Sequence, residues 1–240
     1  MVLIPGEDAT LSWWSPSLLT ALASSHRVTI FDLPGTGFSG PGAGASVASL
    51  AEATGGLIGA LGLTHPELVG WGLGGEIALD LALMHAADAG SIVLADTCAG
   101  GALSAPLPPS AALLASPEAT LTELSSVVFG SAQARARSSW LREMDLEPPD
   151  NMVASAVSAE AAVQQRFLAT GIPVSALAKL RVRVLAIAGT ADALFPPVDA
   201  SAIVTAVRGA REMLIAGAGY GAILQLDPAH LSSLEQFLAG

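Results

Sequence analysis

Basic residues and cysteines are scarce in this sequence. Only ten of its 240 residues are Lys or Arg, against 21 Asp or Glu, so the formal net charge is -11. Nucleic-acid binding depends on clustered basic side chains that displace counterions, and this charge balance argues against it. Lys179 is the only lysine, which also disfavours a polybasic membrane anchor. We therefore expect neither nucleic acid nor an anionic membrane surface as a partner.

Cys98 is the only cysteine, so an intramolecular disulfide is impossible. No apolar run reaches the roughly 20 residues of a membrane span, and no signal peptide is visible. The expected compartment is the cytoplasm. Met1 leads straight into the strand-like segment Val2–Ile4. A domain rarely begins inside its sheet. One alternative is therefore that an upstream segment, with the first strands or a signal, is missing.

The composition is that of a packed globular chain, with 52% hydrophobic and 13% charged residues. Abundant alanine and a preference for Arg over Lys suggest a GC-rich bacterial genome. The length of 240 residues suits one sizeable domain, or one domain with a lid.

Strand and helix patterns alternate along most of the chain, which predicts the α/β class, with a mostly parallel sheet and helices on both faces. The predicted strands are Val2–Ile4 and residues 28–32, 67–70, 91–96, 182–188 and 212–215. The predicted helices cover residues 15–24, 47–61, 76–86, 198–207 and 231–238.

The alternation stops between residues 102 and 177, which begin with Pro106, Pro108 and Pro109. Helical patterns follow at Leu121–Val128 and at residues 132–142 and 151–169. We interpret this stretch as a helical cap. The predicted organisation is an α/β core over residues 1–101, a cap over 102–178, and the rest of the core over 179–240.

The most informative segment is Gly70-Trp71-Gly72-Leu73-Gly74, between a predicted strand and a predicted helix. In this strand–turn–helix context, the pattern G-x-S-x-G presents a nucleophilic serine at the tip of a strained turn. Here the tip is Gly72. Glycine suits such a backbone but has no side chain with which to attack a substrate.

Three further segments, together with this elbow, resemble the α/β-hydrolase family, and the esterases, enol-lactonases and cofactor-free haloperoxidases in particular. Residues 31–39, FDLPGTGFS, are similar to the family's D-x-x-G-x-G-x-S stretch. Residues 92–97, IVLADT, are similar to the strand after the elbow helix. Residues 189–192, GTAD, with Pro196 and Pro197 after them, resemble the turn that carries the acid of the catalytic triad.

The resemblance implies three triad positions, and two of them hold unsuitable residues. The nucleophile position falls on Gly72, the acid on Asp192 and the histidine on Tyr220. Tyrosine has an ordinary pKa near 10, so it is a poor base at neutral pH. We interpret Asp192 either as a hydrogen-bond partner of Tyr220 or as a functional carboxylate desolvated by Leu194 and Phe195. The triad is therefore predicted to be degenerate.

The resemblance also places an oxyanion hole near Glu7 and the backbone N–H of Leu73. The family usually has His-Gly where this chain has Pro5-Gly6, followed by Glu7 and Asp8. Two carboxylates beside the hole would repel a developing oxyanion.

Several other residues are candidates for a ligand pocket. Cys98 follows a strand at the expected ligand end of the sheet, as a stand-in nucleophile or a buried packing residue. The remaining candidates are Trp13, Trp14, Trp71, Phe38 and Leu194, and the alternative for the aromatic residues is simple core packing. The four histidines are interpreted as surface residues, and no cluster has metal-ligand spacing. We therefore expect no metal and no cofactor.

These observations favour a non-hydrolytic member of the α/β-hydrolase family that binds a small apolar or amphipathic ligand, or a protein partner. A homodimer is compatible with the sequence. Two enzymatic alternatives stay open. One is an isomerisation or cofactor-free proton transfer through Asp192 and Tyr220. The other is residual ester or lactone hydrolysis through Cys98 or an activated water.

Overall fold

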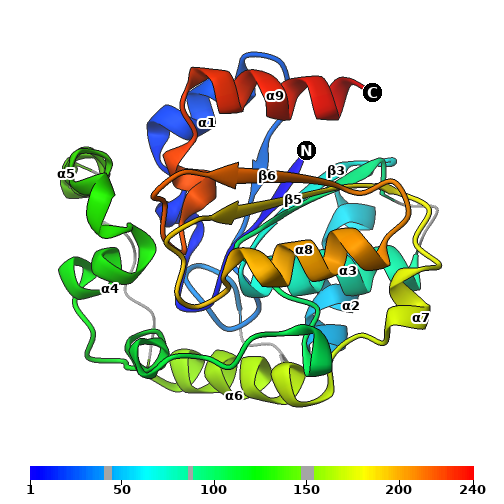
Figure 1. The fold of residues 1–240 in the computed structure, drawn as a ribbon, viewed down its shortest axis with the longest axis horizontal. Helices are drawn as coiled ribbons and strands as arrows, with labels where there is room; N and C mark the ends of the chain where they lie inside the picture. Colours follow the sequence, from blue (N-terminus) through cyan, green and yellow to red (C-terminus); the bar gives the residue numbers. More distant parts are fainter. Residues whose placement is uncertain (41–44, 86–88, 147–153) are drawn as a thin grey trace.

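The structure, a computed structural model, describes residues 1–40, 45–85, 89–146 and 154–240. Its centre is a six-stranded sheet in the order β2-β1-β3-β4-β5-β6, in which every neighbouring pair is parallel (Figure 1). The strands are β1 (Val2–Ile4), β2 (Thr29–Ile30), β3 (Glu67–Trp71), β4 (Ser91–Ala95), β5 (Arg183–Gly189) and β6 (Arg211–Ile215). The predicted α/β class is confirmed.

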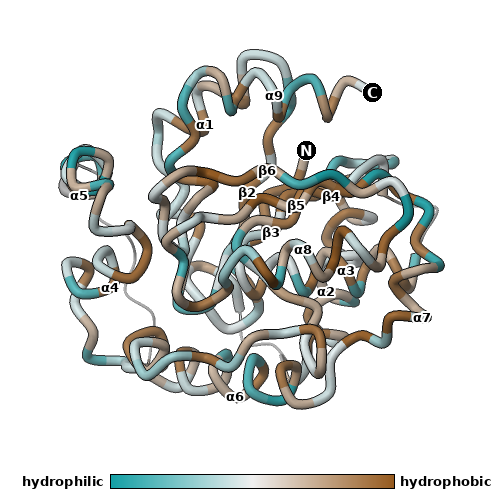
Figure 2. Tube along the Cα trace, in the orientation of Figure 1, coloured by the Kyte–Doolittle hydropathy of each residue, from teal (hydrophilic) through white to brown (hydrophobic). Residues whose placement is uncertain are grey.

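Burial explains why these segments form strands. Every residue of β1 and β4 is buried, and so is every residue of β5 except Arg183. A parallel sheet covered on both faces requires such continuous apolar runs. Figure 2 shows the strands as a hydrophobic layer in the middle of the molecule. β2 is shorter than predicted, with two residues where residues 28–32 were expected.

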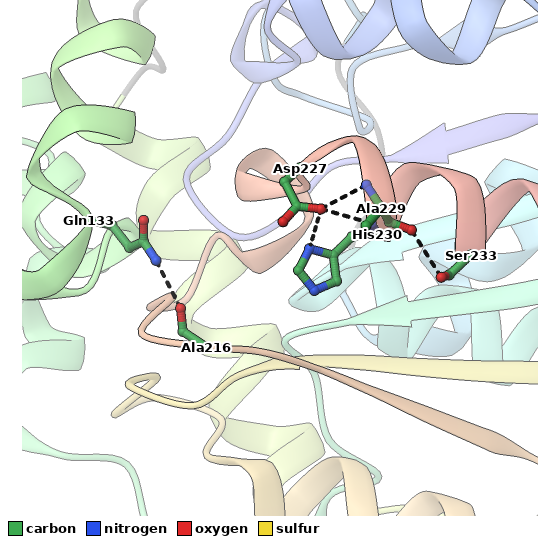
Figure 3. Close-up of polar contacts among 6 residues, drawn as sticks. All are labelled: Gln133, Ala216, Asp227, Ala229, His230 and Ser233. Carbon is green, nitrogen blue, oxygen red and sulfur yellow. Dashed lines mark hydrogen bonds and ion pairs between the residues drawn. The ribbon is translucent and has the colours of Figure 1, made fainter.

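Helices cover both faces of the sheet. α1 (Pro16–Ala23) and α9 (Pro228–Ala239) lie on one face, and α2 (Val47–Ala60), α3 (Leu73–Met84) and α8 (Pro197–Ala206) lie on the other (Figure 1). Polar side chains cap three of these helices, with Ser15 at α1, Ser46 at α2 and Asp227 at α9. The Asp227 carboxylate accepts hydrogen bonds from the N–H groups of Ala229 and His230, each at 2.9 Å (Figure 3).

The helix after the elbow begins earlier than predicted, at Leu73 instead of residue 76. The Gly72 carbonyl accepts hydrogen bonds from the N–H groups of Gly75 and Glu76, so the helical ladder starts directly at the turn. The sequence misses this because two glycines in the first turn read as loop. The predicted end of this helix, at residue 86, lies outside the described residues.

The stretch between β4 and β5 is helical, as predicted. It contains the α-helices α4 (Leu121–Val128), α5 (Ala134–Leu146), α6 (Ala154–Thr170) and α7 (Val174–Leu177) and the short 3-10 helices η2 (Gly101–Leu103), η3 (Pro109–Leu113) and η4 (Ser131–Gln133). Two further 3-10 helices are η1 (Leu11–Trp13) and η5 (Ala222–Gln225). Residues 151–153 of the predicted third helix lie outside the described residues.

This inserted segment packs into the same hydrophobic core as the sheet. Trp140 and Phe167, which are buried, belong to one cluster with residues of β1, β3 and β4. The Gln133 amide also donates to the Ala216 carbonyl at 2.8 Å, which ties the insertion to the loop after β6 (Figure 3). α4 and α5 lie beyond the carboxyl ends of the strands, and α6 lies below α2 and α3 (Figure 1).

Candidate functional site

The elbow is a turn of one residue between β3 and α3. Gly72 has φ +53° and ψ -119°, a backbone conformation that glycine tolerates without steric cost. Its N–H donates to the Ala95 carbonyl at 2.9 Å, and its carbonyl accepts from the Thr97 hydroxyl at 2.7 Å. A Cβ atom at Gly70 would overlap the backbone of Gly74. The glycines therefore allow β3 and α3 to approach closely.

The side chain of Tyr220 fills the space in front of Gly72. A Cβ atom on Gly72 would overlap the Tyr220 phenol oxygen and would lie 2.8 Å from its Cζ and 3.1 Å from its Cε2. Tyr220 is 1% exposed, and its carbonyl accepts a hydrogen bond of 2.5 Å from the Trp71 indole N–H. The place where an elbow side chain would project is therefore occupied.

An aromatic cluster holds the Tyr220 ring in this position. Its ring centroid lies 5.1 Å from that of Trp71 and 5.7 Å from that of Phe195. Trp13 continues the cluster, at 5.9 Å from Trp71 and 5.2 Å from Trp140. Trp13 and Trp71, both expected near a pocket, are buried and pack against other rings. Such contacts stabilise a core beyond simple burial.

Asp192 does not hydrogen-bond to Tyr220, and the prediction of that pair is wrong. One Asp192 oxygen accepts from the N–H groups of Leu194 and Phe195, at 2.8 and 3.2 Å. The other oxygen and the Tyr220 hydroxyl are buried without a hydrogen-bond partner. The backbone turn after Asp192 offers closer donors than the phenol. Burial raises the pKa of Asp192 to about 7, as expected for a desolvated carboxyl.

Asp96, which the sequence analysis did not single out, organises the loops around Tyr220. Its two carboxylate oxygens accept from the N–H of Gly189 at 3.0 Å and from that of Ala222 at 2.7 Å. Asp96 is fully buried at the end of β4 and has a φ of +46°. Burial, followed by the charge of Asp192, raises its pKa well above the ordinary value. Its position directly after a buried strand was the available signal.

A second group of buried carboxyls lies beside the elbow. Glu160 of α6 accepts from the N–H of Asp8 at 2.9 Å, and Gln164 of α6 donates to Glu76 of α3 at 2.5 Å. The inserted segment is thus joined to both the loop after β1 and the elbow helix. Glu7, expected near an oxyanion hole, belongs to this group. Leu73, the other such residue, is the fully buried first residue of α3.

Burial raises the pKa of every carboxyl in this group. It raises the pKa of Glu7 and of Asp8 to about 7, and that of Glu160 to about 8. Burial also raises the pKa of Glu76 well above its usual range, and the charge of Glu7 adds to the shift. The described residues provide no ion pair to any of these four carboxyls. Glu7 and Asp8 are therefore about half protonated near neutral pH, and Glu160 is mostly protonated.

Cys98 is fully buried, and its thiol lies 3.5 Å from a carboxylate oxygen of Glu76. Burial, followed by the charge of Glu76, raises the pKa of the Cys98 thiol. Only the thiolate is a good nucleophile, so this environment opposes a catalytic role.

A cavity of about 290 Å³ lies between the inserted segment and the core. Its core side is formed by Glu7, Leu194 and Phe195. Phe38, expected at a pocket mouth, is 78% exposed and is absent from this lining. A larger cavity of about 460 Å³ lies between α2 and α3 and involves none of the predicted site residues.

The histidines lie away from Gly72. His65 and His85 border the larger cavity, and His230 lies 2.9 Å from the Asp227 carboxylate at the start of α9 (Figure 3). His26 contacts Ser25.

Within the part of the chain that the structure describes, no group of three His, Cys, Asp or Glu side chains has a metal-binding arrangement. No helix among these residues is long and apolar enough to cross a membrane.

The parallel sheet, the elbow and the inserted helices define the class of protein. Residues 1–234 match the family described as the alpha/beta hydrolase family, and the chain belongs to this family. Solved structures share the fold. A hydrolase from Pseudomonas aeruginosa PA01 is 24% identical, with a TM-score of 0.78 over 100% of this chain and 89% of that one. The enol-lactonase from Burkholderia xenovorans LB400 is 21% identical, with a TM-score of 0.78 over 100% of this chain and 90% of that one.

Curated relatives match over very different lengths. The polyketide synthase ThaQ of Burkholderia thailandensis is 32% identical over 99% of this chain, which spans 12% of the synthase. A protein of Variovorax paradoxus named for carbamate hydrolysis, RutD, is 34% identical over 39% of this chain and 36% of its own length. The chain therefore covers only a small part of ThaQ and about a third of RutD.

Proposed function

We propose that this chain is a non-hydrolytic member of the α/β-hydrolase family, and that it binds a small apolar or amphipathic ligand beneath its helical cap, residues 102–178. The observation that carries the proposal is the Tyr220 ring against Gly72. The elbow has no nucleophile, and its place is filled by a buried side chain that has no hydrogen-bond partner. A hydrolytic triad requires a nucleophile, a base and an acid that act together, and only Asp192 keeps a suitable side chain.

A ligand is favoured over a protein partner by the distribution of apolar groups. Among the described residues, the exposed large hydrophobic side chains are single residues from different parts of the chain: Phe38, Leu61, Met84, Val174, Val198 and Leu214. Stable protein interfaces instead concentrate apolar residues in one patch. The cavity beside Glu7, by contrast, brings apolar residues of core and cap together, as small-molecule sites do.

We also propose that the chain acts as part of a longer protein, and the match to ThaQ supports this. Almost the whole of this chain corresponds to 12% of that polyketide synthase. A polyketide is therefore one ligand to screen.

A panel of short acyl esters and lactones tests the proposal. The purified chain should give no turnover above the uncatalysed rate. Turnover above the uncatalysed rate would contradict it.

The alternative chemistry, proton transfer through Asp192 and Tyr220, is favoured by one observation. Asp192 has a pKa near 7 and one unpartnered oxygen close to an unpartnered phenol, as general acid–base catalysis requires. Any activity found on an enolisable ketone should then be lost in Asp192→Asn. Unchanged turnover in that variant would reject the role.

A further inference from the structure

We propose that the cavity beside Glu7 binds a primary ammonium group that carries an apolar tail. This inference rests on the proposed function, because the ligand occupies the same space beneath the cap. It specifies the chemistry that the cavity selects.

The cavity is apolar on most of its surface and polar in one region. Its apolar lining comes from the segment 107–115, from Ala161 of α6, and from Leu194 and Phe195. Its polar residues are Glu7, Gln164 and Gln165. A ligand that fills it must therefore combine an apolar body with one compact polar group.

Two unpartnered groups on this lining, the Gln164 carbonyl and the Glu7 carboxyl, can accept hydrogen bonds. Gln164 is 2% exposed, and one N–H of its amide donates to Glu76. Its carbonyl oxygen has no partner. Among the described residues, the Glu7 carboxyl also makes no hydrogen bond and no ion pair. An ammonium group has three donors and no acceptor, so it complements these atoms.

The surrounding charges favour a cation over a neutral donor. Glu7 lies beside Asp8, Glu76 and Glu160, whose carboxyls influence one another electrostatically. No described Lys or Arg forms an ion pair with any of these groups. Buried carboxylates without a counter-charge are costly, and a bound ammonium group would supply that charge. Glu7, whose pKa is raised to about 7 by burial, would ionise more readily with the cation in place.

Other ligand classes fit these atoms less well. A ketone or an ester with the same tail would gain no charge interaction with Glu7 and its neighbours. A carboxylate would be repelled by Glu7 and its neighbours. An alcohol with the same tail would gain the apolar contacts without the charge interaction.

Calorimetry with three probes of equal tail length tests the inference: hexylammonium, 1-hexanol and hexanoate. At about pH 8 we expect hexylammonium to bind at least about tenfold more tightly than hexanol, and hexanoate not to bind. Glu7→Gln should reduce the hexylammonium affinity about tenfold and leave hexanol unchanged. Glu52→Gln, which makes the same charge change at the other cavity, should change neither.

A substitution that fills the cavity tests whether the probes bind there. Ala161→Phe should abolish binding of both probes, with folding confirmed by its thermal transition. Equal affinity for hexanol and hexylammonium, or an unchanged hexylammonium affinity in Glu7→Gln, would overturn the inference. Those results leave the non-hydrolytic function standing, because ester turnover tests it independently. If no probe binds, the ammonium site is rejected together with ligand binding at this cavity.

Discussion

The phenol oxygen of Tyr220 lies where a side chain on Gly72 would have to project. The two residues are far apart in the sequence but in contact in the fold, so each must be interpreted together with the other. Glycine at the elbow leaves room for the ring, and the ring leaves no room for a nucleophile. This pair is the observation on which the proposed loss of hydrolysis rests.

Gly72→Ala should destabilise the fold by about 2–4 kcal/mol, because the new Cβ meets a buried ring and the backbone has a positive φ. Urea unfolding measures this loss. Gly59→Ala is the matched control, since a Cβ there meets no atom within 4 Å, and it should stabilise helix α2 slightly. Equal stability of Gly72→Ala and the wild type would contradict the packing described for Tyr220.

Tyr220→Phe should leave stability unchanged or raise it by about 1 kcal/mol. The hydroxyl is buried without a partner, so its removal abolishes a desolvation cost and no hydrogen bond. The free energy of unfolding in urea checks this. A loss of more than about 1 kcal/mol would show that the hydroxyl has a partner after all, with Asp192 as the first candidate.

Stability should fall as pH rises from about 4.5 to about 8. The pKa values of Glu7, Asp8, Glu160 and Asp192 are raised in the folded chain to between about 7 and about 8. The folded state therefore binds these protons more tightly than the unfolded state, and this advantage is lost as the groups ionise. Urea unfolding at about pH 5 and about pH 8 should differ by at least about 2 kcal/mol.

Glu7→Gln should flatten this dependence, because it removes one of the titrating groups and its repulsion of the others. Glu118→Gln, which replaces an exposed carboxyl, serves as the control and should leave the slope unchanged. Stability that rises with pH over this interval would mean that cations stabilise these carboxylates.

Cys98 should resist thiol reagents in the folded chain. It is fully buried, and its thiol pKa is raised, so little thiolate is present. Reaction with a chromogenic disulfide should begin only when denaturant unfolds the protein. Rapid labelling under native conditions would revive the hypothesis of a cysteine nucleophile.

The fold could be predicted from the sequence because the strands are continuous apolar runs. The turns also carry glycines, which allow a tight backbone and close packing. The bounds of the helix over Leu121–Val128 are confirmed. Helix α3 was predicted to begin too late, since glycines that permit close packing look like a loop.

The site was harder to predict, because its residues meet only in three dimensions. The unusual residues at positions 72 and 220 were visible in the sequence, but the Tyr220 ring packing against Gly72 was not. The roles of Asp96 and Glu160 were also missed, since an isolated carboxyl says nothing about burial. The proposed Asp192–Tyr220 hydrogen bond failed because backbone N–H groups lie closer to Asp192.

Intact-mass analysis after treatment with a fluorophosphonate, which labels activated serine nucleophiles, tests the central claim most directly. The wild-type chain should keep its unmodified mass, because the elbow offers no hydroxyl and Tyr220 fills its place. A stoichiometric adduct that disappears on prior unfolding would contradict the account, since it would reveal an activated nucleophile in the folded protein.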